Sequence, residues 1–189
     1  MTCYVDGNAT AADKAALAVA QKGWAVCREP GKRGDRKFVL ACVAENPLAI
    51  TAVSDDLLDD REIMLTVVKQ NGSLLALASE KLRADKEVVM AAVKQRGWAL
   101  SCASAALRAD RQVVLAAVSN CGIALEFATR ELRSDSEVVA AAVRQDVLAE
   151  RFGSASAKRD DGYVDRIVHK GKDSNLPLSN AMNLFMRGD

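Results

Sequence analysis

The amino-acid sequence predicts an all-α protein made of tandem 25-residue helix-turn-helix repeats that stack as a short α-solenoid. Three observations favour this fold. An aspartate opens a similar apolar segment at every 25th residue, a glycine or proline divides each unit, and the second half of each unit carries apolar residues at helical spacing. Because so short a unit cannot bury its apolar face alone, neighbouring units must share one core.

The first half of each unit begins at an equivalent aspartate, namely Asp35, Asp60, Asp85, Asp110 and Asp135. Residues 60 to 84 and 85 to 109 share 12 identities in 25 positions, and residues 110 to 134 share 12 with residues 85 to 109. This level of internal similarity is typical of a repeat architecture.

A short apolar run such as residues 88 to 93 is compatible with a buried parallel strand as well as with a helix. Two features favour helix. The opening aspartate suits a helix N-cap, and the acidic residues Glu62, Glu87 and Glu137 suit the positive end of the helix dipole. Alanines such as Ala91 and Ala92 form helices readily and strands poorly.

The second half of each unit follows a residue that breaks the first helix. Gly72, Gly97 and Gly122 stand at equivalent positions, and Pro47 stands there in the earlier unit. After the break, apolar residues recur at i, i+3 and i+7, as in Ile50, Val53, Leu57; Leu75, Ala78, Leu82; Leu100, Ala103, Leu107; and Leu125, Ala128, Leu132. This spacing predicts a helical stripe that faces the core.

The regularity of the repeat divides the chain into three parts. Residues 1–34 are expected to form a degenerate first repeat and a loop, because Gly23 and Trp24 match Gly97 and Trp98 before the register breaks. Residues 35–150 are expected to form the helical array. Residues 151–189 are expected to form a divergent cap and tail, since terminal repeats need a polar outer face.

The unit from Asp85 to Arg108, D-x-E-V-V-x-A-A-V-x-x-x-G-x-x-L-x-x-A-x-x-x-L-R, resembles the short helical repeats grouped as domain of unknown function 4116. The resemblance covers about residues 35 to 145 and extends more weakly to residue 11. It implies a helical repeat fold. It implies no activity and no catalytic residue.

The composition restricts the classes of partner. With 26 basic and 25 acidic residues, the chain has no strong general field for nucleic acid or an anionic membrane. Five widely spaced cysteines suggest neither a disulfide framework nor a metal site, and we expect no cofactor. Without a signal sequence or a membrane span, we expect an intracellular protein, cytoplasmic or organellar after removal of a targeting segment.

The break between the two halves varies most among the units, and repeat proteins often adapt such positions to binding. Solvated turns are the alternative explanation. Tryptophan follows the glycine in only some units, where it either anchors a partner or fills a gap under a loop. The candidate binding residues are Trp24, Trp98, Lys69, Asn71, Lys94, Arg96 and Asn120.

Two charged rows are predicted along one edge. Arg83, Arg108 and Arg133 each precede by two residues one of the aspartates Asp85, Asp110 and Asp135, in the series that starts at Asp60. The expected role is a structural ladder in which arginines near helix ends alternate with aspartates. An arginine row that binds phosphates is the alternative, weakened by the neighbouring aspartates.

The function expected from these features is a noncatalytic protein-protein interaction or scaffold module, with a protein partner or a larger complex. The alternative is a helical repeat protein that binds single-stranded nucleic acid, which the near-neutral charge disfavours. An enzyme is the third and least favoured class. His169 lies among aspartates but belongs to no recognisable catalytic set, so it is expected to be a surface residue.

Overall fold

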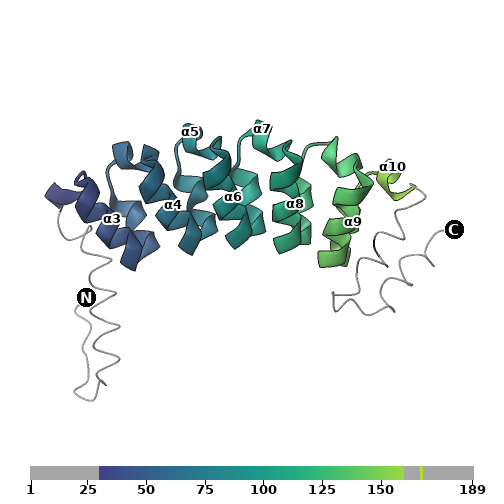
Figure 1. Cartoon of the computed structure of the whole chain (residues 1–189), viewed down its shortest axis with the longest axis horizontal. Helices are drawn as coiled ribbons and strands as arrows, with labels where there is room; N and C mark the ends of the chain where they lie inside the picture. Colours follow the sequence, from purple (N-terminus) through teal and green to yellow (C-terminus); the bar gives the residue numbers. More distant parts are fainter. Residues whose placement is uncertain (1–29, 160–166, 168–189) are drawn as a thin grey trace, which may run out of the picture.

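The repeats stack side by side into one elongated array, with the α-helices in a row (Figure 1). The computed structural model describes residues 30–159 and residue 167, and strands are absent from this part of the chain. Each unit begins with a ten-residue α-helix. These helices are α3 (Arg36–Glu45), α4 (Arg61–Gln70), α6 (Lys86–Gln95), α8 (Arg111–Asn120) and α9 (Ser136–Gln145).

The second half of each unit is a 3₁₀ helix followed by one short helical turn. The 3₁₀ helices are η2 (Pro47–Ala52), η4 (Gly72–Leu77), η5 (Gly97–Cys102), η6 (Gly122–Phe127) and η8 (Val147–Phe152). The short turns are η1 (Pro30–Lys32), η3 (Asp55–Asp59), α5 (Glu80–Arg83), α7 (Ala105–Arg108), η7 (Leu132–Ser134) and α10 (Ala155–Lys158). The last repeat therefore extends past the expected boundary at residue 150.

Helical structure in both halves confirms the predicted all-α repeat fold, but the second half is not one continuous helix. In the unit that begins with α4, Ala78 is extended, and the Ser79 hydroxyl accepts a hydrogen bond from the Leu82 amide at the start of α5. A serine that caps a new turn competes with continuation of the preceding helix. The expected stripe nevertheless reaches the core, since Leu75, Ala78 and Leu82 are buried.

The predicted aspartate caps are present in all five ten-residue α-helices. The Asp85 carboxylate accepts hydrogen bonds of 2.8 and 3.1 Å from the backbone amides of Glu87 and Val88. Asp35, Asp60, Asp110 and Asp135 make the same pair of bonds in their own units. Because these bonds satisfy free amides of the first turn, the aspartates fix where each helix begins.

The core lies between the α-helix row and the 3₁₀ row. Helix α6 packs against α4 and α8, against η5 of its own unit and against η4 of the preceding one. Val88, Val89 and Val93 are fully buried there, and no polar or charged residue is buried in the described part of the chain. The seam is therefore dry and made mainly of Val, Ala and Leu, as the composition predicts.

The repeated glycine allows two units to come close together. A β-carbon added to Gly97 would lie 2.5 Å from the carbonyl oxygen of Ala117, on the α-helix of the next unit. Gly72 and Gly122 face Ala92 and Ala142 in the same way. Since these glycines do not have positive φ angles, tight packing explains them, and not only the break in the helix that the sequence indicates.

Candidate functional site

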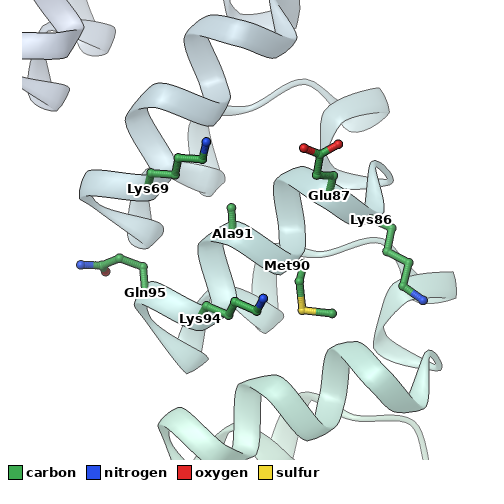
Figure 2. A pocket seen from close by; sticks show the side chains of 7 residues that line it. All are labelled: Lys69, Lys86, Glu87, Met90, Ala91, Lys94 and Gln95. Atoms are coloured by element: carbon green, nitrogen blue, oxygen red, sulfur yellow. The ribbon is translucent and has the colours of Figure 1, made fainter.

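A groove of about 700 Å³ opens on the α-helix row between α4 and α6. Figure 2 shows Lys69 on one helix and Met90, Ala91 and Lys94 on its neighbour. Met90 and Ala91 are half-buried and supply an apolar floor, while both lysines are exposed. Two of the binding residues expected from the sequence, Lys69 and Lys94, therefore line one surface.

The other charged side chains of the groove are engaged in ion pairs. Glu87 pairs with Arg61, and Lys86 lies 2.7 Å from the Asp110 carboxylate. Within the described part of the chain, neither Lys69 nor Lys94 has an ion-pair partner. The charge that the groove can offer to a ligand is therefore positive.

A second surface follows the 3₁₀ helices, which leave large apolar side chains in solvent. We call this surface the apolar row, and its most exposed members are Leu48, Leu77, Trp98 and Leu148. Trp98 is 46% exposed, and its ring meets Phe127 of the next unit edge-on, with centroids 5.2 Å apart. Trp98 is therefore exposed and in contact with the next unit, which disfavours the alternative that it fills a gap.

The helix break is largely occupied by bonds between units, which changes the interpretation of Asn71 and Asn120. The Asn120 side chain accepts a 2.7 Å hydrogen bond from the Gly97 amide and donates one of 3.1 Å to the Lys94 carbonyl. Asn71 caps η4 through the Ser73 amide, and Arg96 donates to the Ser73 hydroxyl at 2.9 Å. Asn120 and Arg96 join neighbouring units and Asn71 caps a helix of its own unit, so we leave them out of the candidate surfaces.

Amides at the same place in other units make similar bonds. Gln70 donates to the carbonyl of Val43, Gln95 to that of Gln70, and Gln145 to that of Asn120. Gln95 also accepts a bond from the Gly72 amide. An amide carries both a donor and an acceptor, so it bridges two backbone groups of the preceding unit, and this explains why Gln and Asn recur at the end of the α-helix.

The aspartates form a ladder, but their partners differ from the arginines that we expected. Arg61 donates to Asp85 at 2.8 Å and also pairs with Glu87, both in the next unit. The other pairs are Arg36 with Asp60, Lys86 with Asp110 and Arg111 with Asp135. Stacking places the first helical residue of one unit beside the cap of the next, whereas Arg83, Arg108 and Arg133 lie on another segment.

The ladder shifts the acidities of its members. The hydrogen bond from Arg61 lowers the pKa of Asp85 below its ordinary value against a smaller opposing effect of burial, and the bond from Lys86 does the same for the pKa of Asp110. For Asp60 and Asp135, burial opposes most strongly, yet the bonds from Arg36 and Arg111 and from backbone amides lower the pKa. All four caps are therefore held ionised.

The arginine row expected from the sequence lies on the short helical turns that follow the 3₁₀ helices, away from the aspartates of the ladder. The backbone carbonyls of Arg83, Arg108 and Arg133 accept hydrogen bonds from Ser104, Thr129 and Ser154 of the next unit. Arg83 and Arg108 line a smaller pocket of about 380 Å³, and the Nε atom of each is buried without a hydrogen-bond partner. The Arg133 Nε donates to the Phe152 carbonyl at 2.9 Å.

Two residues considered in the sequence, Trp24 and His169, lie outside the described residues. In the described part, no cluster of three or more His, Cys, Asp or Glu side chains is arranged to hold a metal ion. The same part contains no helix with the length and apolar character needed to cross a membrane.

Sequence reasoning missed the leucines of the apolar row and the basic half of the ladder. A signal was present for both. Residues 48, 73, 98, 123 and 148, a series that holds the named members of the apolar row except Leu77, are separated by 25 and are apolar in four units. The residue after the opening aspartate is Arg or Lys in the four units from Arg36 to Arg111. Neither pattern shows by itself which neighbour it meets, because contact across units depends on the stacking geometry.

Comparison with known proteins gives a family but no function. The family model described as Domain of unknown function (DUF4116) matches residues 35–76, 60–108 and 110–149. No curated protein and no solved structure matches the chain.

Proposed function

We propose that this chain, which belongs to the family Domain of unknown function (DUF4116), is a noncatalytic protein-protein interaction or scaffold module. The observation that carries the proposal is the apolar row on the 3₁₀ helices. Trp98 at 46% exposure and Leu148 at 63% exposure are large apolar side chains left in solvent beside a core that is otherwise closed. Apolar side chains that gather on one face are typical of protein contact sites.

The contacts between adjacent units support this role. The dry seam, the amide bonds and the charged ladder all join adjacent units, so the apolar row is held on a preformed support. Binding through a preformed surface avoids much of the entropy cost of ordering flexible groups. Tryptophan is also a frequent anchor of protein interfaces, because it combines a large apolar area with few rotatable bonds.

A photo-cross-linking amino acid at position 98 of the full chain tests the proposal in extracts of cells that express the protein. We expect a discrete adduct that excess wild-type chain removes by competition and that excess Trp98→Ser chain does not. Serine occupies the equivalent position at Ser73, so this substitution suits the fold. A cross-linker at the exposed Lys37, on the α-helix row, is the matched control.

Equal adducts from positions 98 and 37, or no adduct at 98 together with a monomeric protein in sedimentation, would count against the proposal. An adduct between two copies of the chain would support a scaffold that assembles with itself. An adduct with another protein would support a heterologous complex.

The second candidate function is binding of single-stranded nucleic acid, and one observation favours it. The aspartates that were expected to neutralise Arg83 and Arg108 pair with Arg61 and Lys86 instead. Both arginines line one pocket, where phosphates are suitable ligands, and Glu80 of the same pocket lies 3.9 Å from Arg83. Binding of a labelled oligouridine that weakens steeply with salt and is lost in Arg83→Gln/Arg108→Gln would support this alternative.

A further inference from the structure

The groove between α4 and α6 lies on the α-helix row, whereas the apolar row follows the 3₁₀ helices. We propose that this groove is a second docking site and that it takes an acidic amphipathic helix of a partner protein. The inference does not depend on the apolar row, because it rests on different residues. Three features of the groove identify the occupant: its charge, its floor and the form of its opening (Figure 2).

The charge of the groove selects an acidic partner. Arg61 neutralises Glu87, and Asp110 neutralises Lys86, both through ion pairs between units. Lys69 and Lys94 occupy equivalent positions one repeat apart, and no described acidic side chain pairs with either of them. Two unpaired ammonium groups on neighbouring helices complement carboxylates spaced along one segment of a partner.

The floor selects an apolar face. Met90 and Ala91 line the groove and are half-buried, and the position of Met90 carries Leu65 and Leu115 in the adjacent units, also half-buried. Methionine adapts its shape to different contact surfaces, and the neighbouring leucines extend the apolar surface along the row. A segment with leucines on one face and glutamates at its edge therefore matches both the floor and the rim.

The form of the groove disfavours other classes of ligand. Its polar groups are three lysines, one glutamine and Glu87, which is paired with Arg61, and they do not converge on a point as in a small-molecule site. None of the described residues that line the groove is an aromatic one on which a base would stack. An opening of about 700 Å³ between α4 and α6 can take side chains of a helix laid across it.

A lysine near a helix C-terminus also stabilises the helix by interacting with the helix dipole. This structural role explains the two lysines of the groove without a ligand. That role leaves the ammonium group free to bind. The apolar floor packs partly against the core and stays half-exposed beside the lysines, where a docked helix would cover it.

The test uses the full chain and two fluorescein-labelled peptides of about 15 residues, roughly the length at which a helix becomes stable in water. The first peptide has leucines on one face and glutamates along its edges, and the second has lysines in place of the glutamates. Fluorescence anisotropy should show saturable binding of the acidic peptide alone. The Lys69→Glu/Lys94→Glu variant should weaken this binding by about tenfold or more.

Two further variants separate charge from shape. Lys37→Glu changes an exposed lysine on α3 to the residue that Glu62 and Glu87 carry at the same position, and it should leave the affinity within about twofold. Met90→Ala introduces the residue found at Ala140 and should weaken binding several-fold by removing part of the floor. Circular dichroism of each variant checks that the fold is kept.

The proposal is overturned if the acidic peptide does not bind, if both peptides bind equally, or if the lysine reversals have no larger effect than Lys37→Glu. It is also overturned if a labelled oligouridine occupies the groove more tightly than the acidic peptide and is lost in the same double variant. Because Trp98→Ser should leave peptide binding unchanged, failure at the groove and failure of the apolar row give different results.

Discussion

Arg61 donates a 2.8 Å hydrogen bond to the carboxylate of Asp85, and Asp85 at the same time caps the α-helix of the following unit. One side chain thereby fixes the start of a helix and joins that helix to its neighbour. The pair repeats along the array, with Lys86 and Gln112 replacing Arg61 and Glu87 one unit later. The lysine still reaches the aspartate at 2.7 Å and then meets a neutral amide, so the contact is retained with less charge.

This double role predicts that Asp85 contributes to stability in a pH-dependent way. The bond from Arg61 lowers the folded-state pKa, so the stabilisation is present above the unfolded value of about 3.9 and is lost as pH falls through the folded pKa. Asp85→Asn keeps a cap oxygen but removes the charge. Urea unfolding between about pH 7 and pH 2.5 should therefore show a smaller acid loss in the variant.

The expected loss for Asp85→Asn at neutral pH is modest, at about 1 kcal/mol or less, because the pair is partly exposed to solvent. Asp56→Asn, at an exposed aspartate of η3, is the control. If acid lowered the stability of Asp85→Asn and of the wild type equally, the charge of Asp85 would have no part in the ladder.

The close approach at Gly97 predicts a large effect of a single methyl group. Gly97→Ala places a β-carbon about 2.5 Å from the Ala117 carbonyl, so two units must move apart. The expected cost is about 1 to 3 kcal/mol, which is typical of overpacking, although alanine favours helices more than glycine does. Thermal and urea unfolding measure this cost.

Gly34→Ala is the matched control for Gly97→Ala, since its nearest neighbour, the Ser54 hydroxyl, lies at an ordinary 3.6 Å. This change should be neutral or slightly stabilising. Equal effects at both glycines would show that backbone freedom matters at Gly97 and that the contact with Ala117 does not.

The hydrogen bonds of Asn120 predict a structural role for a residue that the sequence suggested as a binding residue. Asn120→Ala removes the bonds to the Gly97 amide and the Lys94 carbonyl and should cost about 1 to 2 kcal/mol. Ser119→Ala, at the exposed neighbouring position on α8, should have little effect. A variant at Asn120 with unchanged stability but reduced partner binding would restore the original interpretation.

The exposure of Trp98 predicts its fluorescence. The chain has two tryptophans, so Trp24→Phe leaves Trp98 as the single emitter. With 46% of the residue exposed, its emission should be red-shifted towards that of tryptophan in water, and acrylamide should quench it readily. A blue-shifted emission that acrylamide does not quench in the isolated protein would show that Trp98 is buried. That result would contradict its place in the exposed apolar row.

The sequence by itself determined the repeat, the residue at which the ten-residue α-helix of each unit begins, and most of the core. These features depend on contacts within one unit or on a pattern that recurs in each unit. Asp85 caps its own helix through the amides two and three residues away, and Val88 and Val93 mark the buried face by their spacing alone.

The tertiary structure decided which residues meet across units. Arg61 lies 24 residues from Asp85, and Arg83 lies only two residues from it, yet the more distant arginine makes the pair. Likewise, Asn120 reaches the Gly97 amide, and Lys69 and Lys94 come to line one groove, only when neighbouring units are stacked. The offset between successive units results from the packing of the whole seam, so it cannot be predicted from the pattern of a single repeat.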